Sequence, residues 1–223
     1  MALRHDNDIS SVWKSIMQSH ASLGNPLTCT PATDEEISAA EHRMGYPMPL
    51  QLRQLYRLTN GMPRLKGCAA SFPWDLHLPR VETFKPDSYD SMQNFYKEME
   101  MWCLDNYYLY IDASGIIFEW EKVFEIERGD AIIANSLVEY LKRWDDLLMQ
   151  RVSKVVEAEQ SLASALSDVG LASLPAEISS MITVYALPSQ VQIKHRDMRV
   201  KSKGYTHESW FVRFDNAHKR IFG

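Results

Sequence analysis

Carboxylates are the residues of this chain best placed to do chemistry. Ten lie between residues 87 and 127, opposed there by only two lysines. Glu119 and Glu121 are two positions apart in an alternating stretch, which predicts one face of a strand for both. Such a pair can act as acid and base when one carboxyl keeps its proton. Exposed acidic pairs are more common than perturbed ones, so a solvated or partner-facing strand is the favoured interpretation.

Other patterns of catalytic residues are missing from the sequence. The seven histidines show no metal-binding spacing, and the nucleophile elbow and glycine-rich phosphate loops are absent. The three cysteines are too far apart for a zinc site, and Cys103 beside Trp102 is interpreted as a buried thiol. We therefore expect no catalytic residue, no metal and no cofactor.

Three N-terminal helices are predicted to position these residues. The first covers residues 7–23, with apolar residues at helical spacing. The second begins at the capping box formed by Thr33 and Glu36. The third follows Pro49 and is stopped by the dipeptide Asn60–Gly61, because glycine accepts the left-handed conformation that ends helices.

The centre of the chain predicts a helix, a strand hairpin and a closing helix. Residues 87–107 fit one amphipathic helix, and residues 107–120 fit two strands joined at Asp112–Gly115. Phe118 and Trp120 alternate with glutamates, which predicts a half-buried antiparallel sheet with one apolar and one acidic face. The closing helix has the stripe Leu137, Leu141, Trp144 and Leu148. Further on, residues 191–200 and 208–216 read as basic strands.

This order of elements resembles the SUKH superfamily of the Smi/Knr type. The residues that match are Glu36, Ile37, Glu41, Gly45, Pro49, Leu52, Tyr56, Asn60 and Gly61, followed by Trp120, Tyr140, Leu141 and Trp144. The resemblance covers roughly residues 7–150, and the helix that ends in Asn-Gly is its most specific part. Two features depart from the pattern: residues 64–74 fit the family's glycine-rich strand pair only in part, and Asp112–Gly115 approximates its acidic-glycine turn.

The resemblance implies an α+β domain without catalytic activity, with an antiparallel sheet packed against helices. Many bacterial relatives are immunity proteins that neutralise toxins, commonly nucleases or deaminases, whereas fungal relatives include regulatory scaffolds of cell-wall synthesis. We accordingly expect a SUKH-like domain over residues 1–150 and a helical and basic β extension of unknown role over residues 151–223. The expected function is non-enzymatic binding of a protein partner, a cognate toxin whose active site is blocked. The alternative is that this protein is a regulatory scaffold related to the regulators of cell-wall synthesis.

The acidic stretch suits such a partner. A toxin that acts on nucleic acid needs a basic groove for phosphates, and an inhibitor can copy the phosphates with carboxylates and gain a steered encounter. A merely solubilising face explains the same run of charge equally well. The expected contact residues are the acidic ones on the strand face and loops: Asp87, Asp90, Asp112, Glu119, Glu121, Glu125 and Glu127.

The C-terminal stretch has the opposite charge. Residues 192–223 contain eight lysines and arginines against three acids, with Tyr205, Trp210, Phe211 and Phe214 between them. Aromatic side chains between cations can stack on bases, but the net charge of −5 disfavours nucleic acid. A basic tail can instead dock on the acidic 87–127 region, within the chain or across a homodimer.

Composition sets the remaining expectations. No run of eighteen apolar residues is present, so a membrane partner is not expected. The N-terminal residues show no secretory signal, and three widely separated cysteines suit reduced thiols. Both observations predict a cytoplasmic protein.

Overall fold

The computed structural model describes residues 8–23, 26–62, 78–85, 90–105, 109–124, 131–168 and 208–222. These residues form the helices α1 (Ile9–Ser22), α2 (Asp34–Met44), α3 (Leu50–Tyr56), α4 (Asp90–Met99), α5 (Leu137–Asp168) and α8 (Glu208–Phe222), the short 3-10 helices η1 (Val81–Thr83) and η2 (Glu121–Phe124), and the strands β1 (Trp102–Asp105), β2 (Leu109–Ile111), β3 (Ile117–Glu119) and β4 (Ile132–Ala134). The predicted α+β class is confirmed.

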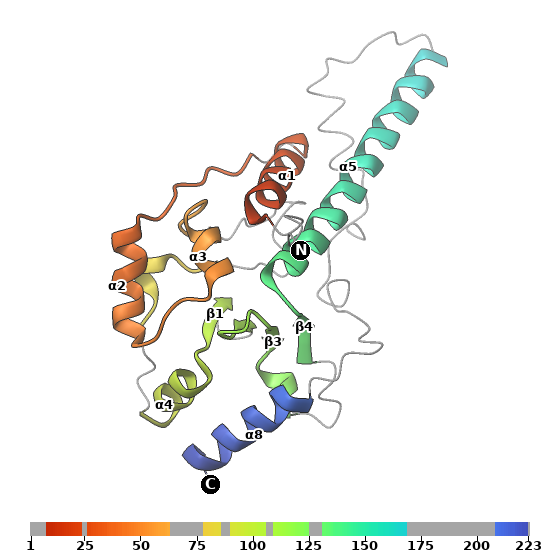
Figure 1. Cartoon of the computed structure of the whole chain (residues 1–223). Coiled ribbons are helices and arrows are strands. Elements are labelled where there is room, and N and C mark those ends of the chain that lie inside the picture. Colours follow the sequence, from red (N-terminus) through yellow and green to blue (C-terminus); the bar gives the residue numbers. More distant parts are fainter. Residues whose placement is uncertain are drawn as a thin grey trace, which may run out of the picture.

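The four strands form one antiparallel sheet in the order β1-β2-β3-β4. The predicted hairpin is its centre: Leu109 pairs with Glu119 and Ile111 with Ile117 across the turn at Asp112–Gly115. Helices cover both faces, with α1, α3 and α5 on one side of the strands and α4 and α8 on the other (Figure 1).

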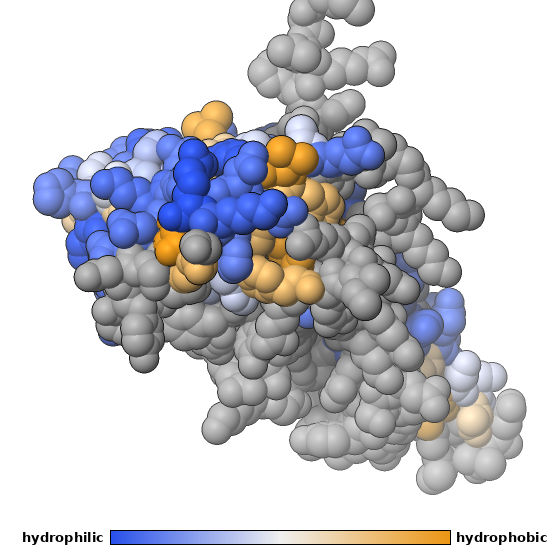
Figure 2. Space-filling view, turned by 90° about the horizontal axis from the view of Figure 1, so that it is seen from below, coloured by the Kyte–Doolittle hydropathy of each residue, from blue (hydrophilic) through white to orange (hydrophobic). Residues whose placement is uncertain are grey.

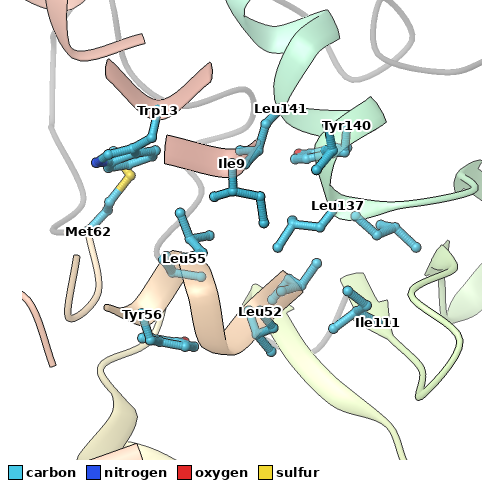
Figure 3. Close-up of a cluster of buried hydrophobic side chains, with 14 of the residues drawn as sticks. Ile9, Trp13, Leu52, Leu55, Tyr56, Met62, Ile111, Leu137, Tyr140 and Leu141 are labelled. Carbon is cyan, nitrogen blue, oxygen red and sulfur yellow. The ribbon is translucent and has the colours of Figure 1, made fainter. Parts of the chain in front are cut away.

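The larger core lies between the sheet and the N-terminal helices. Figure 3 shows Ile9 and Trp13 of α1, Leu52 of α3, Leu141 of α5 and Ile111 of β2 meeting in one cluster. The stripe predicted for the closing helix is buried there, since Leu137, Leu141, Trp144 and Leu148 are all in this core. Burial of this apolar surface is the main stabilising contribution to the fold.

A second core lies on the opposite face of the sheet. Its buried residues include Phe95 and Met99 of α4, Tyr110 and Phe118 of the hairpin, and Trp210, Phe214 and Ala217 of α8. The sheet is therefore covered on both faces. This differs from the predicted half-buried sheet with one acidic face.

Local signals fix the ends of the N-terminal helices. Asp8 caps α1 by accepting a hydrogen bond from the Ser10 N–H, and Thr33 and Glu36 form the predicted capping box of α2. The last residue of α3 is Tyr56, so Asn60–Gly61 lies four residues beyond the helix and does not itself stop it.

Two other predictions need correction. The basic strand predicted over residues 208–216 is part of helix α8, whose buried residues recur every three to four positions. The helix predicted over residues 87–107 ends at Met99, and Cys103 lies in β1. The division at residue 150 into a SUKH-like domain and an extension stays a prediction, and helix α5 continues across that residue. The other predicted strand, residues 191–200, lies outside the described residues.

Candidate functional site

The Asn-Gly dipeptide holds a distant segment, residues 78–84, against the end of α3. The Asn60 side-chain oxygen accepts a hydrogen bond from the Val81 N–H at 2.8 Å, and the Asn60 amide donates to the Glu82 carboxylate at 3.1 Å. The Met62 N–H donates to the Leu78 carbonyl at 3.0 Å. Asparagine is suited to this position because one side chain supplies both a donor and an acceptor.

Gly61 makes the close approach possible. Its φ is +83°, and an added Cβ would lie 2.9 Å from Arg80 Cγ and 3.0 Å from the Leu78 carbonyl oxygen. Only glycine meets both requirements without strain. Other residues are strained in the left-handed conformation, and their Cβ would also collide with Arg80 and Leu78. The dipeptide that the sequence marked as a helix stop is thus the centre of a clamp.

Two further side chains complete this clamp on residues 78–84. The Tyr56 hydroxyl donates to the Pro79 carbonyl at 2.8 Å, and its complete burial raises the pKa of Tyr56 well above the ordinary value. Arg43 of α2 donates to the carbonyls of Phe84 and Val81, each at 2.9 Å. Backbone carbonyls of an irregular segment need such partners when they are partly buried.

The clamp presents a short polar surface. Arg80, Glu82 and Thr83 are exposed, and Arg80 forms an ion pair with Glu82 at 3.2 Å. The pKa of Glu82 is lowered, first by a hydrogen bond from its own backbone and then by Asn60 and Arg80, with burial opposing them. The Glu82 carboxylate therefore has two partners within the chain, Asn60 and Arg80.

Asp112 occupies a structural position in the hairpin turn. One carboxylate oxygen accepts hydrogen bonds from the backbone N–H groups of Ser114 and Ile116, each at 3.0 Å. The other accepts from the Trp210 indole N–H of α8 at 2.9 Å. Its exposed fraction is 0%, so a partner cannot contact this carboxylate in the present arrangement.

Glu119 is also covered. It is 8% exposed and lies on the same face of the sheet as Leu109 and Ile117, toward the larger core. This burial does not suit the role of an exposed contact residue, and the acid–base pair with Glu121 stays a prediction because the Glu121 side chain is not described.

The structure does not describe the side chains of the other five predicted contact residues. Asp90 is the first residue of α4 and Glu121 the first residue of η2, but their side chains are not described. Asp87, Glu125 and Glu127 lie outside the described residues.

Helix α8, the described part of the basic C-terminal stretch, packs within the chain, one of the two arrangements that its charge suggested. Arg220 of α8 forms an ion pair with Glu98 of α4, and Arg213 donates to the Glu98 carbonyl at 3.4 Å. Trp210 and Phe214 are buried, which removes them as stacking surfaces for bases. Sequence reasoning missed the helix that makes this contact, although the recurrence of apolar residues at positions 210, 214, 217 and 221 has the period of a helix.

Among the described residues, no group of three or more histidine, cysteine or acidic side chains is arranged to hold a metal ion. The helices of the same part of the chain are too short or too polar to cross a membrane.

An antiparallel sheet covered by helices, with an Asn-Gly clamp whose glycine has a positive φ, defines this part of the chain as an α+β domain. A model of the SMI1 / KNR4 family (SUKH-1) matches residues 31–143, just over half of the 223 residues, and the chain belongs to that family. The match contains the clamp and all four described strands, whereas α1 and α8 lie outside it. Searches among curated proteins and among solved structures gave no match.

Proposed function

We propose that this protein is a non-enzymatic immunity protein that binds a cognate toxin of the nuclease or deaminase class and blocks its active site. Membership of the SMI1 / KNR4 family (SUKH-1) is the observation that carries the proposal, because the SUKH superfamily includes immunity proteins. The acidic stretch over residues 87–127 supports it, since a toxin that acts on nucleic acid presents a basic groove.

The proposed contact residues are the predicted acidic ones of that stretch other than the two that the structure shows to be buried. Asp112 and Glu119 are buried, so the electrostatic contact is assigned to Asp87, Asp90, Glu121, Glu125 and Glu127. Carboxylates of this kind act mainly by raising the association rate, and that effect weakens as salt screens the charges.

The first test is co-expression with the product of a neighbouring toxin gene. If the proposal holds, the neighbour stops growth when expressed alone, and this protein restores growth and co-purifies with it. A neighbour that is harmless, or a toxic neighbour that neither binds nor is neutralised, contradicts the immunity function and favours the regulatory scaffold.

The second test isolates the electrostatic part. Reversing two charges, Glu125→Lys with Glu127→Lys, is expected to slow association with the toxin at least tenfold at low salt. The matched control reverses two exposed acids elsewhere, Glu35→Lys in α2 and Asp146→Lys in α5, and is expected to change the association rate much less. Equal effects from the two pairs would show that only net charge matters.

A further inference from the structure

Helix α8 packs in a hydrophobic groove on one face of the sheet. The groove is built from α4, the hairpin and η2, and its lining side chains are Phe95, Tyr110, Phe118, Trp120 and Phe124. All of these residues lie within the family-matched range 31–143, whereas α8 begins 65 residues beyond its end. The receiving surface and the helix that fills it therefore belong to different parts of the chain.

The central contacts are aromatic. The Trp210 ring centroid lies 4.8 Å from that of Phe118, and Phe214 lies 5.1 Å from Phe95 and 5.7 Å from Trp120. Trp210, Phe214 and Ala217 are buried, while the exposed residues of α8 are polar apart from Val212 and Phe222. Anchors spaced by three and four residues are typical of an amphipathic helix bound in a hydrophobic groove.

Polar contacts fix both ends of α8. At its start, the Trp210 indole N–H donates to the buried Asp112 carboxylate at 2.9 Å. Ten residues later, Arg220 pairs with Glu98, whose carbonyl also accepts from Arg213. Ten helical residues span about 15 Å. The groove therefore binds the Trp210 indole N–H and the Arg220 guanidinium at two points that are about this far apart along the helix. This pattern of charge and hydrogen bonding sets the direction in which a helix binds.

We propose that this face of the sheet is a helix-binding groove, that α8 occupies it as an internal ligand, and that a partner protein presenting an amphipathic helix of the same chemistry displaces α8. The partner's helix carries a tryptophan, an aromatic residue one turn later and an arginine near its end. The described surface seen from below is mostly hydrophilic around a smaller hydrophobic area (Figure 2). Trp210 and Phe214 of α8 pack on the buried rings of Phe118 and Phe95, so this apolar contact becomes available only when α8 leaves. This site does not depend on the proposed immunity function, and its test needs no toxin.

The test uses the full chain with a specific protease site inserted within residues 169–207. The protein is purified folded and then cut, which removes the covalent link between α8 and the preceding part of the chain. A fluorescent peptide of residues 208–223 is added, and its anisotropy and gel-filtration position report binding. We expect the labelled peptide to exchange into the cut protein and to bind the uncut protein at least tenfold more weakly, because the tethered α8 competes for the groove.

Peptide variants test the chemistry of the groove without altering the protein. Trp210→Phe keeps an aromatic ring but removes the indole N–H, and about a tenfold loss of affinity is expected, because the buried Asp112 carboxylate then loses one of its hydrogen-bond donors. Arg220→Gln is expected to lose less than about threefold, since the Arg220 side chain is 66% exposed. Val212→Ala, on the exposed side, is the matched control and is expected to bind like the parent peptide.

Two outcomes overturn the proposal. In one, the labelled peptide never exchanges into the cut protein while α8 stays bound, which would make α8 a permanent part of the core. In the other, the released α8 leaves behind a protein that has lost its cooperative urea transition. A failure of toxin neutralisation would leave both readouts unchanged, so it is distinguishable from a failure of the groove.

Discussion

At the residue scale, the Asn60–Gly61 dipeptide forms the centre of the clamp. Asn60 and Gly61 join the end of α3 to residues 78–84, and each is required for a different reason: the asparagine supplies hydrogen bonds, and the glycine supplies space and a positive φ. The sequence marks this position correctly but gives it another role, because a stop signal and a clamp contain the same two residues.

Gly61 and Gly45 allow the two requirements to be separated. Both have a positive φ, +83° and +80°, but a Cβ at Gly45 would meet its nearest atom, in Lys97, only at 4.0 Å. Gly45→Ala is therefore expected to lower the free energy of unfolding by about 1 kcal/mol, and Gly61→Ala by about 2–4 kcal/mol, the excess reflecting the collision with Arg80 and Leu78. Urea denaturation measures both. Equal losses would mean that the segment moves aside without cost.

His20 gives the fold a dependence on pH. Its ring is buried against Trp144, and neither ring nitrogen has a hydrogen-bond partner among the described residues. Burial lowers the pKa of His20 to about 4, and the charge of Arg151 acts in the same direction. Between this value and the pKa of about 6.5 in the unfolded chain, the unfolded state binds more protons.

The contribution of His20 to stability is therefore complete above pH 6.5 and is lost as the pH falls toward 4, by about 2–3 kcal/mol. His20→Leu removes this titration. We expect the difference in urea midpoint between the variant and the wild type to shift in favour of the variant from pH 7 to pH 4.5. Parallel curves for the two proteins would contradict the burial of a neutral imidazole.

At the scale of elements, α8 shows what the sequence could predict and what it could not. The N-terminal helices were predictable because their caps and stripes are local: Thr33 with Glu36 specifies a start wherever the helix packs. In α8, five residues of apparent alternation at 210–214 suggested a strand, whereas the period over all fifteen residues is helical. Burial of Asp112 and Glu119 was not predictable, because it depends on which distant elements cover the sheet.

The packing of α8 predicts a sharp contrast between two of its residues. Phe214 is 1% exposed and contacts four aromatic rings of the groove and of α8, whereas Val212 is 58% exposed. Phe214→Ala is expected to destabilise the second core by about 3–5 kcal/mol, and Val212→Ala to change stability by less than about 0.5 kcal/mol. Tryptophan fluorescence during urea denaturation reports on this core through Trp120 and Trp210. Similar effects from both variants would show that α8 does not pack as described.

At the scale of the whole molecule, the family-matched range is not the folding unit. Residues 31–143 lack α1, whose Ile9, Trp13 and Ile16 fill the larger core. The range also ends just before Trp144 and Leu148, which lie in the same core. On the other face, the groove loses α8. Each missing element leaves an apolar surface that must meet water, and such surfaces promote unfolding or association.

Three lengths of chain test this division into two cores. Residues 31–143 alone are expected to show no cooperative urea transition. Residues 1–168 restore α1 and α5, so the larger core is expected to unfold cooperatively, while the uncovered aromatic groove binds a hydrophobic dye. The full chain is expected to unfold cooperatively and to bind little dye, because α8 covers the groove. If residues 31–143 unfolded at the same urea concentration as the full chain, α1 and α8 would be additions to an already complete domain, and the two-core description would be wrong.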